Sequence, residues 1–245
     1  MTFETPAEKQ QYVNQMFARI AHRYDLMNRV MTAGQDKRWR RLLIEQAQLP
    51  PNGKLLDIAT GTGDIAFEAW RQQPILSQVV GADFTLPMMQ VGRQRWQKRY
   101  DHVHPPATRP EISWSGADTL HLPFPDDTFD AVVSGFLLRN VTSVPQALAE
   151  QRRVCRPGGR VLVLEIPRTA DSLFGALFRL YFHRIVPLLG GLISGQRDAY
   201  SYLPASADAF LRPEELKSEM EKVGLRQVGY TMLMFSTVAL HAGVK

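Results

Sequence analysis

The sequence predicts an α/β protein with a doubly wound, mainly parallel seven-stranded sheet. Two observations support this prediction. Apolar strand-like segments alternate with helix-like segments along most of the chain, which is the pattern of repeated βαβ units. The segment 129–136 is almost continuously apolar, as expected for a strand that helices cover on both faces. The length of 245 residues is enough for one domain with a sizeable core.

The region before the first strand is predicted to be helical over residues 5–48. Apolar residues recur at helical spacing at Val13, Met16, Phe17 and Ile20. A second helix is expected from about Lys37 to Gln46, ahead of two prolines. Because residues 1–50 precede the first strand, we expect them to fold back over the strand ends as a helical lid.

The remaining elements follow in a regular order. Strands are predicted at 55–58, 78–82, 111–115, 129–136, 160–165, 225–230 and 235–241, and helices at 65–70, 87–98, 144–154 and 213–223. Residues 101–110 have the composition of a surface loop. Residues 170–210 interrupt the alternation with an apolar and aromatic segment, so we expect a helical insert before the last strands of a single domain.

A glycine-rich turn follows the first strand and indicates a nucleotide-like ligand. Gly61 and Gly63 flank Thr62 between a strand and a helix, and glycine lets the backbone approach a ligand closely. Asp83 ends the second strand, where a carboxylate can accept hydrogen bonds from both hydroxyls of a ribose. This position fits the ribose of either NAD or S-adenosylmethionine. Asp57 lies just before the turn and would repel a pyrophosphate, which favours S-adenosylmethionine.

Two further motifs favour the same cofactor. Residues 116–118, at the end of the third strand, are placed for an adenine edge, with an ordinary turn as the alternative. The segment Leu122-Pro-Phe-Pro-Asp-Asp-Thr-Phe-Asp130 resembles the entry to the fourth strand of class I S-adenosylmethionine-dependent methyltransferases. Val154-Cys-Arg-Pro-Gly-Gly159 resembles the approach to their fifth strand.

The chain also resembles a particular family, the ubiquinone/menaquinone biosynthesis C-methyltransferases. The similar segments are Tyr24-Asp-Leu-Met-Asn28 with Thr32, Gly34 and Trp39-Arg40, then Leu138-Arg-Asn-Val141, and Arg153 to Gly159 through Glu165. The resemblance implies the Rossmann-like class I methyltransferase fold. It departs from the family at Asp36, where histidine is usual, and at Gly135, where serine is common.

The resemblance implies roles for the site residues. The cofactor contacts that we expect are at Asp57, Gly61, Thr62, Gly63, Asp83, Asp118, Thr119 and Gly135. At Gly135 the contact would come from the backbone or from neighbouring Ser134. No metal is expected, because the six histidines lack ligand spacing.

The implied reaction is C-methylation of a reduced demethylmenaquinone-like quinol. Arg139 is expected to stabilise the phenolate or to orient a water molecule, since arginine stays protonated. Asn140 would orient that water, and Asp118 or Asp25 would finally accept the proton. Tyr24 and Asn28 are expected to close over the substrate. The alternative for all of these residues is a structural role in helix ends and packing.

The charge and composition of the chain limit the kinds of partner that it can bind. The net charge is +5 and the pI about 9.5, which fits a solvated basic surface or attraction to an anionic membrane. No basic run with interleaved aromatic residues indicates nucleic-acid binding. The apolar segment 173–186 carries Arg179, His183 and Arg184; it would bind a polyprenyl tail at the membrane surface, pack as a lid, or form a dimer contact.

The composition also favours a cytoplasmic protein, peripheral at the inner face of the membrane if the apolar segment binds there. One cysteine, Cys155, suits a reducing compartment. Residues 1–11 are polar, so no signal peptide is expected, and no run of about 18 uncharged apolar residues predicts a spanning helix. The other functions left open are methylation of a ubiquinone precursor, a small aromatic molecule or RNA, an NAD-dependent oxidoreductase, and an inactive cofactor-binding scaffold.

Overall fold

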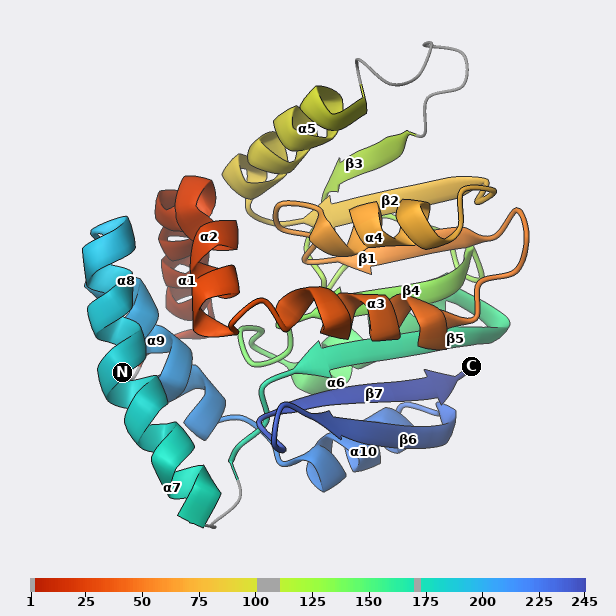
Figure 1. The fold of residues 1–245 in the computed structure, drawn as a ribbon. Helices are drawn as coiled ribbons and strands as arrows, with labels where there is room; N and C mark the ends of the chain where they lie inside the picture. The colour runs from red at the N-terminus through yellow and green to blue at the C-terminus, as the bar shows by residue number, and fades with distance from the viewer. Residues whose placement is uncertain (1–2, 101–110, 170–172) are drawn as a thin grey trace.

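The computed structural model describes residues 3–100, 111–169 and 173–245, and it shows an α/β fold (Figure 1). The predicted loop 101–110 lies outside the described residues. The strands are β1 (Lys54–Ile58), β2 (Gln78–Asp83), β3 (Ile112–Gly116), β4 (Phe129–Gly135), β5 (Cys155–Glu165), β6 (Arg226–Leu233) and β7 (Val238–Val244). They form one seven-stranded sheet in the order β3-β2-β1-β4-β5-β7-β6. Strand β7 runs antiparallel to its neighbours β5 and β6, and the other pairs in the sheet are parallel. The predicted fold class is therefore confirmed.

Alternating side chains of the central strands bury into two different cores. Leu55 and Val133 join the core under α3 (Asp36–Ala47), α4 (Asp64–Gln72) and α5 (Leu86–Tyr100). Leu56 and Val132 join the opposite core, under α6 (Val144–Val154) and α10 (Pro213–Lys222). Both faces of each strand are therefore buried, and this explains the continuous apolar sequence of β4.

The remaining helices form a cap at the end of the sheet where the parallel strands finish (Figure 1). They are α1 (Pro6–Ile20), the 3₁₀ turn η1 (Ala21–Arg23), α2 (Tyr24–Met31), α7 (Leu173–Leu180), the π-helical segment η3 (Tyr181–Ile185), α8 (Val186–Ser194) and α9 (Arg197–Asp208). Their apolar side chains pack into a third cluster that includes Met16, Met27, Phe182 and Tyr200. The N-terminal helices and the insert, far apart in sequence, thus make one layer.

Several boundaries differ from those predicted. The segment 24–28 is the start of the separate helix α2, and β5 begins at Cys155 rather than at Arg160. Residues 156–159 form a bulge in this strand, because the register with β4 shifts between Phe129 and Ala131. A Cβ on Gly159 would lie 2.7 Å from the carbonyl oxygen of Asp130, so glycine permits the close approach. Both C-terminal strands also extend past their predicted ends.

The insert contains a helix of spanning length, although it has no run of about 18 uncharged apolar residues. By length and composition, the 20 residues Gly175–Ser194 form one helix that could cross a membrane, and 22% of its most apolar window is buried. The sequence criterion missed it because Arg179 and Arg184 interrupt the apolar run. Its inner face packs on α9 and on α2.

Candidate active site

Asp57, at the end of β1, is fully buried and hydrogen-bonds the glycine turn that follows the strand. Its Oδ2 accepts hydrogen bonds from the Thr60 hydroxyl at 2.6 Å and from the backbone N–H of Ala66 at 3.2 Å. Its Oδ1 has no partner among the described residues. Burial raises the pKa of Asp57 to about 7. Asp57 therefore joins the turn to the start of α4.

Asp83 joins the same turn to the end of β2. Its Oδ2 accepts a hydrogen bond from the Gly61 N–H at 2.8 Å, and its Oδ1 accepts one from the Thr85 N–H at 2.6 Å. Burial raises the pKa of this carboxyl, while these two N–H groups oppose the rise. Gly61 has φ +57°, in the left-handed region that glycine adopts at low cost.

Thr62 and Gly63 shape the turn from behind. A Cβ on Gly63 would lie 2.6 Å from the ring of Trp114, at a φ of +85°, so only glycine fits there. The Thr62 hydroxyl donates a hydrogen bond to Oδ1 of Asp25 at 2.5 Å, and Asp25 also pairs with Arg95 at 2.7 Å. Asp25 thus ties α2 to the turn. Thr62, Gly63 and Asp25 line neither the cavity at the strand ends nor the cavity under the cap helices.

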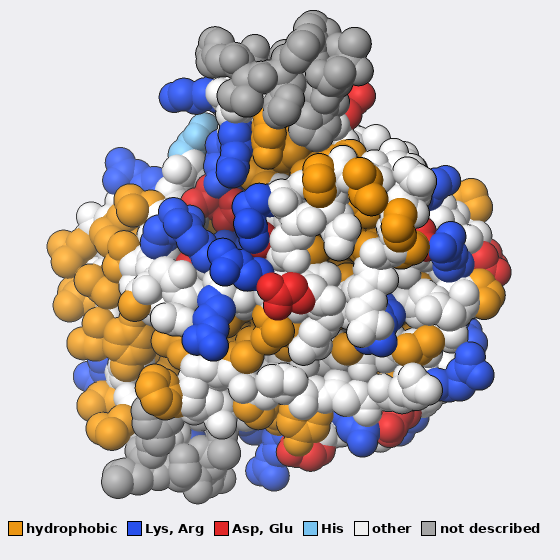
Figure 2. All heavy atoms as spheres, turned by 45° about the vertical axis from the view of Figure 1, so that its right-hand side comes forward, with side chains coloured by type: hydrophobic (Ala, Val, Ile, Leu, Met, Phe, Trp, Pro, Cys, Tyr) orange, Lys and Arg blue, Asp and Glu red, His pale blue; other side chains and the backbone are white. Residues whose placement is uncertain are grey.

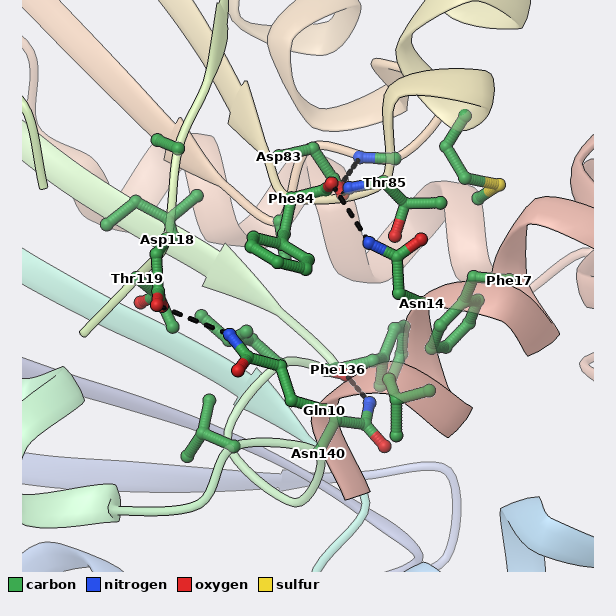
Figure 3. A pocket seen from close by; sticks show the side chains of 18 of the residues that line it. Gln10, Asn14, Phe17, Asp83, Phe84, Thr85, Asp118, Thr119, Phe136 and Asn140 are labelled. Carbon is green, nitrogen blue, oxygen red and sulfur yellow. Dashed lines mark hydrogen bonds between the residues drawn. The ribbon is translucent and has the colours of Figure 1, made fainter. Parts of the chain in front are cut away.

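A first cavity, which we call the strand-end cavity, opens where β1 to β4 finish (Figure 3). From the sheet side it is lined by Gly61, Asp83, Phe84, Thr85, Met88, Asp118, Thr119 and Gly135. Helix α1 covers it from the other side: the Gln10 amide donates to Asp118 at 3.3 Å, and the Asn14 amide donates to the carbonyl oxygen of Phe84 at 3.2 Å. These contacts place the N-terminal helix across the strand ends.

A second cavity, the cap cavity, lies between the sheet and the cap helices. Its apolar walls include Met16, Ile20, Phe178, Phe182 and Val186, and its polar lining includes Asn28, Thr32, Asp36, Arg40 and Arg139. It shares four lining residues with the strand-end cavity, namely Phe17, Tyr24, Phe136 and Asn140. The two cavities therefore meet at these residues. Burial raises the pKa of the Tyr24 hydroxyl at this junction.

Arg139 and Asn140 lie beside the junction with unused hydrogen-bonding atoms. The Arg139 guanidinium forms a buried ion pair with Glu165, and its Nε has no partner among the described residues. The Asn140 amide donates to the carbonyl oxygen of Phe136 at 3.0 Å, which leaves its buried Oδ1 without a partner there. Phe136 itself has φ +59°, a strained conformation that is common at functional sites.

The residues of the strand-end cavity fit S-adenosylmethionine. Asp83 lies on the wall, where a carboxylate can accept hydrogen bonds from a ribose diol. The Thr119 hydroxyl is buried without a partner in the described structure, which suits an adenine edge. The ring of Phe84 provides an apolar face in the same cavity (Figure 3). At Gly135 only the backbone reaches the cavity, because the hydroxyl of Ser134 donates instead to Gln151 at 3.4 Å. Of the two contacts expected there, only the backbone of Gly135 lies on the wall of this cavity.

Some lining residues were not predicted from the sequence. Gln10 and Asn14 are spaced i, i+4 on α1, next to the apolar positions Val13 and Phe17 that predicted the helix. Their shared face could have been recognised as a polar edge of the lid. Glu165 gives no local signal for its pairing with Arg139, since the two are 26 residues apart. Within the described ranges, no group of three metal-ligating side chains is placed to hold a metal ion.

The fold and this site define a class I S-adenosylmethionine-dependent methyltransferase. A Thermotoga maritima methyltransferase of this kind has the same fold, with a TM-score of 0.59 and 19% identity over 94% of this chain and 99% of that one. Phosphoethanolamine N-methyltransferase 2 of Haemonchus contortus, solved with S-adenosylhomocysteine, matches with a TM-score of 0.61 and 15% identity, covering 85% of this chain and 52% of that one.

The chain belongs to the ubiE/COQ5 methyltransferase family, whose model matches residues 5–245. It is 44% identical to the demethylmenaquinone methyltransferase of Thermus thermophilus, over 93% of this chain and 99% of that protein. It is 40% identical to the ubiquinone/menaquinone biosynthesis C-methyltransferase UbiE of Geobacter sulfurreducens, over 97% of this chain and 90% of that protein. The resemblance found in the sequence, the enzyme class and the cofactor are thus confirmed.

Proposed function

We propose that the protein transfers the methyl group of S-adenosylmethionine to a ring carbon of demethylmenaquinol, forming menaquinol. The observation that carries this proposal is the junction between the two cavities. A cavity suited to the methyl donor meets a second, more apolar one, and Arg139 and Asn140 stand beside the junction. The names of the relatives support the quinone as acceptor.

The cofactor, when bound, supplies an electrophilic methyl group on a sulfonium. The residues that would hold it are Asp83 at the ribose, Asp118 and Thr119 at the adenine, and the backbone of Gly61 and Gly135. Asp57 supports the turn beneath the cofactor. Packing of α1 over the cavity excludes water, which strengthens every charge interaction inside.

The acceptor carbon becomes nucleophilic when the adjacent ring hydroxyl loses its proton. Arg139 stabilises the resulting phenolate, held in place by the buried carboxylate of Glu165. The free Oδ1 of Asn140 accepts a hydrogen bond from the water that removes the proton. Asp118 is the better final proton acceptor because it lines the strand-end cavity, whereas Asp25 lines neither cavity. Asp25 is occupied by Thr62 and Arg95. Tyr24 and Asn28 close the quinol side of the junction.

The test is turnover with labelled S-adenosylmethionine and chemically reduced demethylmenaquinone. We expect radiolabelled menaquinol. Binding of S-adenosylhomocysteine without any product would contradict the quinone as acceptor. Because one relative's name includes ubiquinone, a benzoquinol precursor of ubiquinone is run beside it as the second candidate acceptor.

The exposed side of the insert supports contact with a membrane on its cytoplasmic face. Leu180 and Leu192 are 60% and 76% exposed, and Leu177, Ile185 and Leu188 also face solvent. Segment 173–194 carries arginines and no acidic residue, and apolar side chains gather at the left of Figure 2 beside arginine and lysine side chains. An apolar, cationic helix of this kind binds anionic lipid surfaces, and the cap cavity lies directly behind it.

This contact predicts flotation with phosphatidylglycerol vesicles and little with phosphatidylcholine vesicles. The double variant Leu188→Glu/Leu192→Glu should lose about 10-fold or more in vesicle affinity. Ile75→Glu, at an exposed apolar residue outside the cap, serves as the matched control and should float like the unchanged protein. Gel filtration tests the alternative occupant of this face, a second copy of the chain: a dimer that the double variant dissociates would replace the membrane proposal.

A further inference from the structure

A second buried arginine–carboxylate pair faces the cap cavity. Asp36 is 2% exposed, and its Oδ2 pairs with Nη1 of Arg40 at 2.6 Å. The Thr32 hydroxyl donates to Oδ1 of Asp36 at 3.2 Å. Asp36, Arg40 and Thr32 all line the cap cavity. Burying a charged pair beside an apolar cavity costs free energy. A ligand with polar groups at this wall would offset part of that cost.

The pair has hydrogen-bonding capacity left. Arg40 also pairs with Asp64 at 3.0 Å, again through Nη1. Within residues 3–100, 111–169 and 173–245, the contacts of this guanidinium all use Nη1, so Nε and Nη2 stay available. Asp64 is paired with Arg95 as well, at 2.8 Å, and Asp36 keeps a charged carboxylate whose two oxygens have lone pairs left beside their contacts with Arg40 and Thr32. A carboxylate with this charge accepts hydrogen bonds from hydroxyl groups strongly.

The two arginine pairs lie near one another around the junction. The charges of both Arg139 and Arg40 act on the hydroxyl of Tyr24, and Tyr24 lines both cavities. A quinol carries two hydroxyls on opposite ring positions, and the proposed chemistry uses only one, at Arg139 and Asn140. The other hydroxyl enters an apolar cavity, where an unpaired polar group would cost binding free energy.

We propose that Asp36 and Arg40 bind the second ring hydroxyl of the quinol, the one opposite the hydroxyl that faces Arg139. This inference rests on the proposed quinol methylation and names the groups that select a dihydroxy ring. Asp36 accepts the hydrogen bond from the hydroxyl, and Arg40 donates to its oxygen. With both ring oxygens held, the acceptor carbon is fixed in orientation toward the junction.

One competing group is the hydroxyl of Tyr202, which is buried on the cap cavity wall without a partner in the described part of the chain. The charges of Arg139 and Glu165 act on it. It therefore belongs to the surroundings of the first ring oxygen. Tyr202→Phe is consequently the matched control, because it removes a hydroxyl from the same cavity without touching Asp36 or Arg40.

The experiment compares two acceptors with short prenyl tails. One is the reduced 1,4-naphthoquinol, and the other is its mono-methyl ether, which keeps the hydroxyl next to the reacting carbon and masks the opposite one. For the unchanged protein we expect KM for the ether to be about 10-fold or more above KM for the quinol. Asp36→Asn should raise KM for the quinol about 10-fold and leave KM for the ether within about 2-fold, so the preference disappears.

The controls separate this role from a structural one. Tyr202→Phe should change KM for the quinol and KM for the ether by the same factor, so that their ratio is kept. The same result is expected for Asp64→Asn, which removes the other carboxylate partner of Arg40. Affinity for S-adenosylhomocysteine should be unchanged in Asp36→Asn. An unchanged ratio in Asp36→Asn, or loss of the ratio in Tyr202→Phe, overturns the inference. If Asp36→Asn fails to fold, equal KM values for the two acceptors in the unchanged protein overturn it. Absence of turnover with the quinol contradicts the proposed function instead.

Discussion

The strand-end cavity and the cap cavity are built in different ways. Most of the wall of the strand-end cavity comes from residues that follow β1 to β4, such as Gly61, Asp83, Asp118 and Gly135, and α1 covers it. Walls of the cap cavity combine residues from α1 to α3 with residues from α7 to α9, more than 100 positions later. Parallel strands bring their carboxyl ends to one edge whatever the sequence of the loops, whereas the cap forms only when two helical segments pack together. The donor site is therefore a property of the sheet, and the acceptor site is a property of the cap.

The largest expected effect tests whether the two cavities act separately. Arg139 lines the cap cavity and is absent from the wall of the strand-end cavity. Arg139→Ala should lower kcat about 10³-fold, since removing a group that stabilises a developing anion costs that much, with affinity for S-adenosylhomocysteine unchanged. Titration calorimetry and single-turnover assays measure the two quantities.

The matched control for Arg139→Ala is the double variant Arg139→Met/Glu165→Gln, which leaves no unpaired buried charge. It should fold like the unchanged protein and be equally inactive. Loss of cofactor affinity in both variants would show that the cavities are one functional unit.

The converse change is at Asp83, which lines the strand-end cavity alone. Asp83→Ala should weaken S-adenosylhomocysteine binding about 100-fold, because a carboxylate that accepts two hydroxyl hydrogen bonds is lost. Asp83→Asn keeps an acceptor oxygen for one of the two N–H groups, of Gly61 or of Thr85, so it should lose less than Asp83→Ala. KM for the quinol, measured at saturating cofactor, should not change. A large rise in this KM would contradict the proposal that the two cavities bind donor and acceptor separately.

The smallest expected effect concerns Asp57 beneath the strand-end cavity. Burial raises its pKa from 3.8 to about 7, so between these pH values the folded protein holds a proton that the unfolded chain has released. Its contribution to stability is complete below about pH 4 and is lost as pH rises through about 7. Relative to Asp57→Asn, the unchanged protein should lose about 1.4 kcal/mol of unfolding free energy between pH 6 and pH 8.

Urea unfolding of the cofactor-free protein at both pH values measures this difference. A comparison that is flat with pH would mean that Asp57 is ionised in the folded state. The hydrogen bonds from Thr60 and Ala66 would then be accepted by a charged carboxylate.

The donor half of the site could be predicted because its signals are local. Gly61 and Asp83 each follow an apolar strand within a few residues, and the topology of the sheet does the rest. Direct contact of Thr62 and Gly63 with the cofactor stays a prediction: both support the turn, through Asp25 and through packing on Trp114, and neither lines the two cavities. Sequence spacing places a residue in the turn, and the turn geometry decides which way it faces.

The sequence by itself determined the fold class, the glycine turn and the family, because strand periodicity and short motifs depend on neighbouring residues. Only the tertiary structure decided what the polar residues of the cap face. Asp36 stood out in the sequence as a departure at a position where histidine is usual, and the fold places it in a charged pair on the acceptor cavity. Glu165 and Gln10 likewise gain their partners from distant segments. The physical reason is that a buried charge is stabilised by whichever group the packing brings to it, and packing between helices far apart in the chain leaves no local pattern.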